Sequence, residues 1–584
     1  MKPLLHLAPY LKRYKGKIIF GYLFIVLHIG VSAVIPLVVG RAVDFLQNGT
    51  GNYSLLQYAL AIVVLTAISG LFLFFTRQSI IVVSREVEND LRHDFFAHLQ
   101  TLSRKFYNSR TTGDLMAHAT NDINNVRNFL GPGIMYSLQT VTRTVVFLYI
   151  LLSIDAEVTL ISLAPLPLIS ILVYFMGKFA YTRSQKVQEK FSDLTSKAQE
   201  IFSGIRVVKS FVRENHEAGE FDNMSRDYYR KNLSLARVQA FTFPMMFLLT
   251  WVSIILVIYF GGLKVINGQM TLGNISEFMI YLGQLTWPMI AIGWIVNIIQ
   301  RAAPSMKRLL AIMDTKPDID DNNETDTAIT LDNIDGEVEF KDVWFKYPNT
   351  ETYSLKNINL IIPKGTTLGV IGHTGSGKST LINLLPRIFD VTKGNIYIDK
   401  NDIRKIPVKV LREAVGIVPQ ESFLFSTRIN KNIAYSSDSV NQQLVEDSAK
   451  AADLYKDVMD FPKQFETLVG ERGITLSGGQ KQRTSLARAI YKRPRILILD
   501  DSLSAVDTST EEQILQELKT IMKGRTNIII SHRISSIQNA NNIILLKDGE
   551  IKEEGTHNEL LALKGMYYDI YTKQLLEEEI KDLN

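Results

Sequence analysis

The chain has 584 residues, a formal net charge of +5 and no cysteine. The absence of cysteine excludes disulfides, thiolate metal sites and cysteine nucleophiles, and so small a charge for this length gives no indication of nucleic-acid binding. The length suggests several domains, and hydropathy divides the chain in two. About 300 residues at the start carry long apolar runs, whereas about 250 residues at the end have the composition of a soluble α/β protein.

Six stretches of the first half are long and apolar enough to cross a membrane as helices, which takes about 20 residues each. Buried helices of a soluble domain do not fit this length and number. The first stretch has no small-residue cleavage site after it, so we expect a retained span and not a signal peptide. We therefore predict an all-α membrane domain over residues 1–315, with spans at about 18–40, 55–76, 134–154, 158–179, 243–266 and 275–299.

The connections between these spans differ in their basic residues. Segments 77–133 and 178–242 are rich in Lys and Arg, whereas the alternate connections are short and carry only Arg41 and Lys264. Because cytoplasmic connections carry the excess of basic residues, we expect both termini and both long connections in the cytoplasm, with the protein in the cytoplasmic membrane. The long connections have helical patterns, which predicts helices that continue past the membrane and offer contact surfaces to a cytoplasmic partner.

A few polar and aromatic residues within the spans are candidates for function. Arg143 lies in the middle of a span, where a charge is costly; it either faces a functional cavity or pairs with another helix. His28 is expected to form an interhelical hydrogen bond. Thioether and aromatic side chains of the last two spans suggest either an adaptable surface for apolar cargo or lipid and interface anchors: Met245, Met246, Trp251, Tyr281, Trp287, Met289 and Trp294.

The second half begins after a polar, acidic and aperiodic stretch, residues 316–335, which we interpret as a linker to a domain over residues 336–584. In that domain the strand-like TTLGVIG leads directly into GHTGSGKST and a helical segment. This is the context in which G-x-x-x-x-G-K-[ST] forms a P-loop for ATP and Mg²⁺. Lys378 is expected to reach the β- and γ-phosphates, and Ser379 to ligate magnesium. The other residues of the predicted phosphate cradle are Gly372, Thr374, Gly375, Ser376, Gly377 and Thr380.

The stretch ILILDDSLSAVD, residues 496–507, places two carboxylates after an apolar run. The run has the continuous hydrophobicity of a buried parallel strand, and nucleoside triphosphatases place a magnesium carboxylate at the end of such a strand, here Asp500. Asp501 alone would be compatible with a helix N-cap. Beside a P-loop it is better interpreted as the residue that positions the attacking water.

A second glycine motif, LSGGQ at residues 476–480, opens another helical segment. Ser477, Gly478 and Gly479 at a helix N-terminus would form an anion site of their own. The residues of this motif that we expect to contact nucleotide are Ser477, Gly479 and Gln480. Two such sites in one domain can serve the same nucleotide only if two domains face each other head to tail.

With these motifs in sequence, the chain resembles the half-transporters of the ABC exporter family, in which six spans are fused to one α/β P-loop ATPase domain. The resemblance covers nearly the whole length. It implies that two chains clamp two ATP molecules, each between the P-loop of one chain and the LSGGQ of the other. It also implies that Tyr347 stacks on adenine, that Gln420 contacts magnesium and senses the membrane domain, and that His532 contacts the γ-phosphate.

Other segments match the family's pattern as well. LVGERG, residues 468–473, resembles an exporter-specific segment, and SAVD, residues 504–507, resembles the loop that crosses the dimer interface, with Asp507 as its acid. Segments 112–122 and 203–215 resemble the two cytoplasmic connections that dock onto the nucleotide-binding domains.

The chain departs from the family at Asp501, where fully active sites usually carry glutamate. Aspartate is shorter by one methylene, so its carboxylate retreats from the water by more than the ~0.5 Å that catalytic geometry tolerates. Correct positioning of the reacting groups can change the rate of a reaction by orders of magnitude. We therefore expect slow hydrolysis at this chain's own P-loop and an intact LSGGQ that completes a competent site on another chain. That pattern predicts one subunit of a heterodimer; a homodimer that tolerates aspartate is the alternative.

These features together predict ATP-driven export of amphipathic or hydrophobic compounds, of the multidrug type, from a membrane-lipid environment. A lipid flippase and a peptide exporter of the same architecture remain open, because the spans do not separate them. An ATP-gated regulator or channel on the same scaffold is a third hypothesis. The spans exclude a soluble ATPase.

Overall fold

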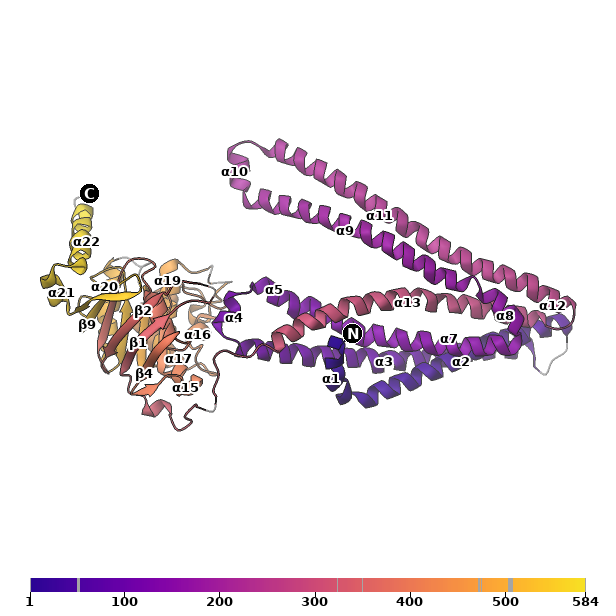
Figure 1. The fold of residues 1–584 in the computed structure, drawn as a ribbon, viewed down its shortest axis with the longest axis horizontal. Coiled ribbons are helices and arrows are strands. Elements are labelled where there is room, and N and C mark those ends of the chain that lie inside the picture. The colour runs from indigo at the N-terminus through magenta and orange to yellow at the C-terminus, as the bar shows by residue number, and fades with distance from the viewer. Residues whose placement is uncertain are drawn as a thin grey trace. The chain divides into compact units, whose positions relative to one another are not determined.

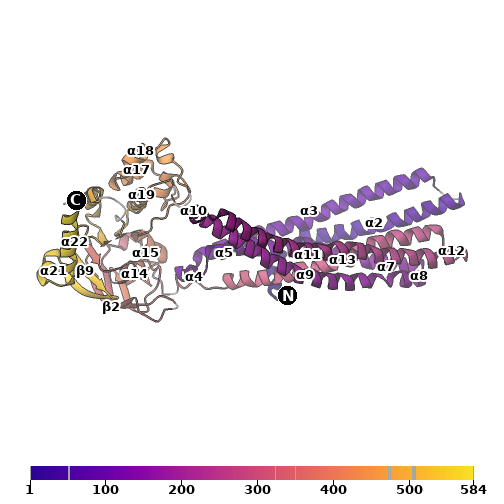
Figure 2. The same ribbon diagram turned by 90° about the horizontal axis from the view of Figure 1, so that it is seen from above.

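The computed structural model describes residues 2–49, 53–322, 324–348, 350–470, 473, 475–502 and 508–582. The chain forms two compact units (Figures 1 and 2). One, the helical unit, comprises Met1–Gln100 and Thr112–Thr315. The other, the nucleotide-binding unit, comprises Thr101–Thr111 and Lys316–Asn584.

The helical unit contains, within its described residues, six helices long and apolar enough to cross a membrane: Lys15–Asn48, Leu55–Thr101, Thr112–Ile154, Ala156–Ser203, Glu214–Ile266 and Leu272–Met313. The six predicted spans are confirmed, and the helices continue past them as expected. Short π-helical segments at His118–Asp122, Phe129–Gly133 and Val257–Gly261, and a turn at residues 164–165, divide some of these helices into shorter elements. The elements of this unit are α1 (Ala8–Arg13), α2 (Lys15–Asn48), α3 (Leu55–Thr101), α5 (Thr112–Ala117), α6 (Ile123–Asn128), α7 (Ile134–Ile154), α8 (Ala156–Leu163), α9 (Leu166–Ser203), α10 (Ile205–Ser210), α11 (Glu214–Leu256), α12 (Gly262–Ile266) and α13 (Leu272–Met313). The short helix α4 (Arg104–Asn108) lies between α3 and α5 in the sequence and belongs to the nucleotide-binding unit.

The last span, α13, packs against α2, α7 and α9. Tyr281 on α13 is fully buried, and its hydroxyl donates a 2.5 Å hydrogen bond to the carbonyl of Ala33 on α2. Met246 is buried as well, so these two side chains belong to the core; neither a cargo surface nor a lipid anchor describes them. The expected interhelical bond of His28 is confirmed: its Nδ1 lies 2.9 Å from the carbonyl oxygen of Ser69 on α3.

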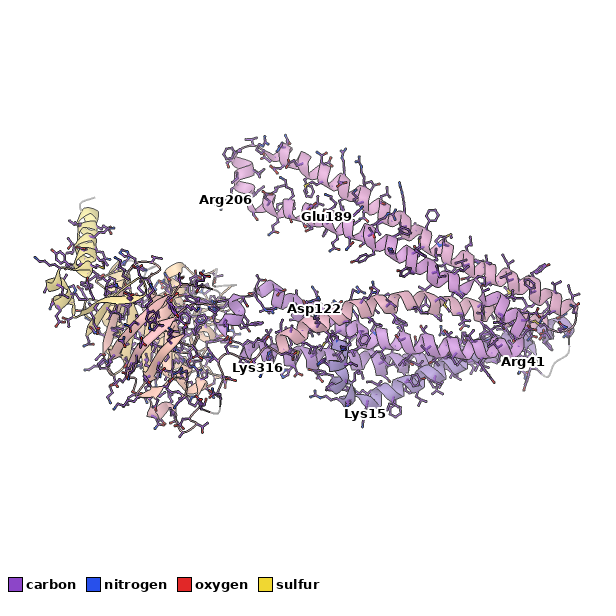
Figure 3. All side chains as sticks on the ribbon, viewed as in Figure 1. Lys15, Arg41, Asp122, Glu189, Arg206 and Lys316 are labelled. Carbon is purple, nitrogen blue, oxygen red and sulfur yellow. The ribbon has the colours of Figure 1, made fainter. Side chains whose placement is uncertain are left out.

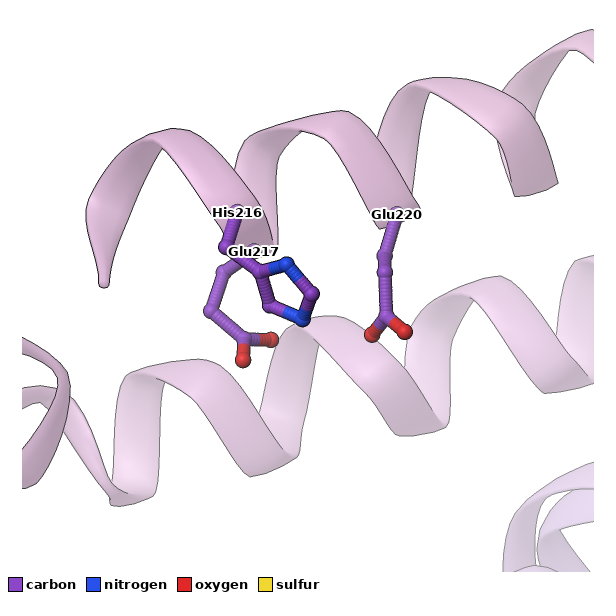
Figure 4. A group of neighbouring side chains, drawn as sticks. All are labelled: His216, Glu217 and Glu220. Carbon is purple, nitrogen blue, oxygen red and sulfur yellow. The ribbon is translucent and has the colours of Figure 1, made fainter.

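Helices α9 and α11 lie side by side, and the short α10 joins them at one end (Figures 1 and 2). Arg206 lies on α10 (Figure 3). Near this end, His216, Glu217 and Glu220 gather on α11 with ligand-type atoms within 4.8 Å of one another (Figure 4). The Nζ of Lys197 on α9 lies 2.8 Å from Glu217 and 2.7 Å from Glu220. Because the ammonium of Lys197 already forms ion pairs with both carboxylates, we assign the cluster to ion pairing between the two helices and not to a metal site.

The described residues of the nucleotide-binding unit form two sheets. A four-stranded antiparallel sheet has the order β2-β1-β4-β5, and a six-stranded sheet has the order β10-β9-β3-β8-β7-β6, parallel except for β10. The strands are β1 (Val338–Phe345), β2 (Leu355–Ile362), β3 (Thr367–Ile371), β4 (Lys393–Ile398), β5 (Asn401–Asp402), β6 (Val415–Val418), β7 (Ile496–Asp500), β8 (Thr526–Ile530), β9 (Asn542–Lys547) and β10 (Glu550–Gly555).

The helices of this unit cover the sheets and complete its core. They are α14 (Lys378–Leu384), α15 (Val408–Ala414), α16 (Ile429–Ile433), α17 (Gln442–Ala451), α18 (Tyr455–Met459), α19 (Gly478–Tyr491), α20 (Thr508–Met522), α21 (His557–Leu563) and α22 (Met566–Asp582). All five residues of β7 are buried, as the apolar run predicts for a central parallel strand. Strands β3, β7 and β8 are adjacent and parallel, so their carboxyl ends meet at one edge, where open α/β sheets bind ligands.

The predicted linker packs on the nucleotide-binding unit. The Oδ1 of Asp321 accepts a 2.8 Å hydrogen bond from the backbone of Val408. Asp318 accepts bonds from Ser103, at 2.9 Å, and from Lys105, at 3.1 Å, beside α4. Residues 101–111 therefore belong with this unit. They belong to the first cytoplasmic connection and directly precede residues 112–122, the segment that resembles the family's docking connection.

Candidate active site

The P-loop follows β3 and ends where α14 begins, at Lys378. Gly375 and Gly377 have φ of +84° and +104°, a region that glycine adopts readily. A Cβ on Gly377 would lie 2.7 Å from the carbonyl of Ser354, so a side chain has no room there. The Nζ of Lys378 donates to the carbonyls of Gly372, at 2.7 Å, and of His373, at 2.9 Å. The lysine thus lies across its own loop.

A cavity of about 280 Å³ opens at this edge of the sheet. Gly372 and Ser376 belong to the same loop but do not line it, and the buried Oγ of Ser376 has no hydrogen-bond partner among the residues that the structure describes. Ser354 and Ile530 line it although no sequence motif marks them. The predicted residues that the fold brings together around it are Tyr347, Thr374, Gly375, Gly377, Lys378, Ser379, Thr380, Gln420, Asp500, Asp501 and His532.

Two of the predicted magnesium ligands are in contact. The hydroxyl of Ser379 lies beside the carboxylate of Asp500, which is only 6% exposed. Burial raises the pKa of Asp500, the hydroxyl of Ser379 opposes the rise, and the neighbouring Asp501 adds to it. Burial likewise lowers the pKa of Lys378, against the attraction of the two aspartates. Hydroxyl, carboxylate and amide oxygens are the hard donors that Mg²⁺ prefers, so Ser379, Asp500 and the exposed Gln420 fit that ion.

Asp501 has φ of +45°, a left-handed conformation that aspartate tolerates better than most residues. Its N–H donates a 2.9 Å hydrogen bond to the carbonyl of Ile530 at the end of β8. This bond ties the carboxyl end of β7 to the strand that leads to His532. The segment SAVD, including Asp507, lies outside the described residues, as do Glu471 and Arg472 of LVGERG.

The loop that carries His532 is held from α22, which the sequence does not indicate. Gln574 accepts a 2.9 Å bond from the backbone N–H of Ile534 and donates a 2.7 Å bond to the carbonyl of His532. The side chain of His532 is exposed and lines the cavity. Gln574 therefore fixes the backbone of this loop through contacts that the local motifs do not indicate.

Tyr347 lines the cavity from the end of β1. Its hydroxyl shares a 3.0 Å hydrogen bond with Thr380, and its ring packs edge-on against Phe345 and Phe389, with centroids 5.0 and 5.5 Å away. These contacts hold the half-buried ring in place, and the ring also lines the cavity, as a platform for base stacking requires.

Comparison with known proteins decides the family. The family model described as "ABC transporter transmembrane region" matches residues 18–289, and the family model described as "ABC transporter" matches residues 355–504. The multidrug resistance-like ATP-binding protein MdlA of Buchnera aphidicola is 34% identical over 98% of this chain and 97% of its own length. The chain belongs to the ABC transporter family.

The transporter is also similar to an ATP-dependent lipid A-core flippase of Syntrophus aciditrophicus, at 33% identity over 89% of this chain and 86% of the relative. The structure of a bacterial Atm1-family ABC exporter with ATP bound superposes with a TM-score of 0.78, at 26% identity, over 97% of this chain and 99% of that one.

The predicted half-transporter architecture and localisation are thus confirmed. The transporter is a multi-pass protein of the plasma membrane with its ATPase domain on the cytoplasmic side, and it acts as a dimer that couples ATP hydrolysis to export.

The LSGGQ motif of the transporter lies apart from the P-loop cavity. Ser477 caps α19: its hydroxyl accepts from the N–H of Gln480 at 3.3 Å, and the Gln480 side chain accepts from the N–H of Ser477 at 3.1 Å. This reciprocal capping box fixes the first turn of α19. Ser477, Gly479 and Gln480 do not line the cavity, so within one chain the two phosphate-binding elements remain separate.

Proposed function

We propose that the transporter is one subunit of a heterodimer that exports amphipathic or hydrophobic compounds, and that its own P-loop site hydrolyses ATP slowly. The observation that carries this proposal is Asp501, a short carboxylate at the position of the catalytic glutamate, in a chain whose LSGGQ motif is complete. The relatives named for multidrug resistance support the cargo class.

The roles of the site residues are part of the proposal. Tyr347 stacks on adenine, and Lys378 with the loop from Gly372 to Thr380 holds the phosphates. Ser379, Asp500 and Gln420 hold the magnesium ion, which when bound neutralises charge on the phosphates. Asp501 lies in the water-positioning place, and His532, held by Gln574, approaches the terminal phosphate. The partner's P-loop receives Ser477, Gly479 and Gln480.

The geometry at Asp501 supports the heterodimer. In this cavity the carboxylate of Asp501 is one methylene short of the reach of glutamate, and its backbone is fixed by the bond to Ile530, so the chain cannot advance to compensate. A partner with glutamate supplies the fast site, completed by this chain's α19. Co-purified with such a partner, the complex is expected to hydrolyse ATP briskly. Loss of the partner's glutamate should then abolish turnover, whereas Asp501→Asn should reduce it little. A homodimer in which Asp501→Asn abolishes activity would contradict this assignment.

Export is tested in inside-out vesicles from cells that produce the complex. A fluorescent hydrophobic dye is expected to accumulate in the vesicles when ATP is added, and not when Lys378→Ala is combined with the same substitution in the partner's P-loop. A matched control is Lys364→Ala, an exposed lysine outside the cavity. Accumulation that persists in the double P-loop variant would exclude ATP-driven export.

Lipid is the second candidate cargo, because one relative is named a lipid A-core flippase. Reconstituted vesicles separate the two candidates: a flippase moves a fluorescent phospholipid between leaflets with ATP, whereas a multidrug exporter moves the dye and leaves the phospholipid. Dye flux in proportion to ATP consumed also excludes a gated channel, whose flux does not follow the ATP consumed.

A further inference from the structure

An arginine to which the described residues offer no counter-ion lies inside the membrane-spanning part of the helical unit. The Nε of Arg143 on α7 is buried and has no hydrogen-bond partner in the described part of the chain. Among the residues that the structure describes, no carboxylate forms an ion pair with it. Its guanidinium lies 6.0 Å from the centroid of Phe147, which satisfies none of its donors. A cation at this depth is retained at a cost, and nothing in the chain's described residues repays it.

Arg143 lines a cavity of about 150 Å³ between α2, α3, α7 and α13. Arg77 is the second cation of its wall, Gln139 and Thr140 add hydrogen-bonding groups, and none of the lining residues is acidic. Guanidinium groups bind carboxylate and phosphate oxygens in a planar, two-point geometry. The composition of the wall therefore favours an anion.

The size of the cavity limits what enters it. Water occupies about 30 Å³ per molecule, so the cavity holds the volume of a carboxylate or phosphate group, but it is smaller than the roughly 300–1,000 Å³ of sites that enclose a whole drug-sized ligand. The remainder of a larger ligand must lie outside. Trp287, which lines the cavity and is 52% exposed, offers an aromatic surface at its edge.

We propose that this cavity binds the anionic headgroup, a carboxylate or a phosphate, of an amphipathic molecule whose apolar tail lies against the exposed aromatic edge. This inference rests on the proposed export function, because only in an exporter does binding in this cavity make anionic amphiphiles a class of cargo. Binding itself requires no ATP, so it is measured independently of transport.

The test uses the intact complex in nanodiscs of phosphatidylcholine, without nucleotide. The probe is dansyl-undecanoic acid, followed by energy transfer from tryptophan, and its uncharged methyl ester is the comparison. We expect the acid to bind about tenfold more tightly than the ester, or more, because charge-assisted bonds contribute that much. Arg143→Gln should remove this preference, and Arg143→Lys should retain most of it. Arg41→Gln, at the far end of α2 from Lys15 (Figure 3), is the charge-matched control and should retain all of it.

Two further arms make the outcome decisive. Excess decanoate should displace the probe, whereas millimolar inorganic phosphate should not; displacement by phosphate alone would overturn the assignment to an amphiphile. Equal affinity for the acid and the ester in the unmodified complex would overturn the proposal without any variant. A preference that survives Arg143→Gln would also overturn it and would assign Arg143 to pairing with the partner chain. If the unmodified complex prefers the acid to the ester but does not export the dye, the result contradicts the proposed function and not this inference.

Discussion

Asp122 and Arg308 join the start of the third span to the end of the sixth, and Arg308→Ala should destabilise the helical unit. The Nε and Nη2 of Arg308 on α13 donate to the two oxygens of Asp122, at 2.9 and 2.5 Å. The Nδ1 of His118 lies 2.6 Å from the same carboxylate. Asp122 (Figure 3) is 7% exposed and Arg308 is 51% exposed, so one partner is desolvated and the other is not.

The magnitude follows from this asymmetry. Breaking a buried ion pair costs about 3–5 kcal/mol, whereas exposed pairs contribute about 1 kcal/mol or less. Because Arg308 is half exposed and His118 remains with Asp122, we expect Arg308→Ala to lower the free energy of unfolding by about 2–3 kcal/mol. In a double-mutant cycle with Asp122→Asn, the coupling energy should be about 2 kcal/mol.

The assay is unfolding of the purified complex in detergent micelles titrated with sodium dodecyl sulfate, followed by tryptophan fluorescence. The control is Arg301→Ala, an exposed arginine two turns earlier on α13. The reasoning is refuted if Arg308→Ala is no more destabilising than Arg301→Ala, or if the cycle gives no coupling energy.

Three further predictions concern the nucleotide-binding unit and its coupling to the spans. Gly377→Ala should lower ATP affinity at least tenfold in an equilibrium binding assay, because its Cβ would meet the Ser354 carbonyl at φ +104°; Gly375→Ala, with no atom within 4 Å, should lower it less. Substitution of Asp114 or Arg206 by alanine should reduce vesicle transport more than ATP affinity, and an equal loss of both would assign these residues a purely structural role. Asp501→Glu should raise the steady-state ATP turnover of the chain purified alone by an order of magnitude or more, because it restores the missing reach; an unchanged rate would show that another feature limits the site.

Contiguous patterns in the sequence were sufficient to predict the spans, the P-loop and the strand before Asp500. Each depends on neighbours in the chain: an apolar run long enough for a membrane, or glycines that turn a strand into a helix. Tyr281 shows the limit of this approach. It lies in an apolar span that predicts its depth, but its burial comes from packing on α2, about 250 residues away in sequence, so the pattern cannot tell a core residue from a surface one.

The site shows the same division. Lys378, Ser379 and Asp500 could be assigned from their motifs, whereas Ser354, which closes over Gly377, and Gln574, which holds the His532 loop, could not. Their contacts join segments that only the sheet order and the docking of α22 bring together. The position of residues 101–111 with the nucleotide-binding unit likewise depends on polar contacts to Asp318, which no local pattern encodes.

The central claim is that Asp501 makes this chain's own ATP site slow. The most direct test measures ATP binding and steady-state hydrolysis by the chain purified alone with magnesium, beside its Asp501→Asn and Lys378→Ala variants. We predict that the unmodified chain binds ATP, hydrolyses it slowly, and changes little on Asp501→Asn, whereas Lys378→Ala loses binding. Brisk hydrolysis by the chain alone, abolished by Asp501→Asn, would contradict the account, because Asp501 would then be a fully effective catalytic base in a homodimer.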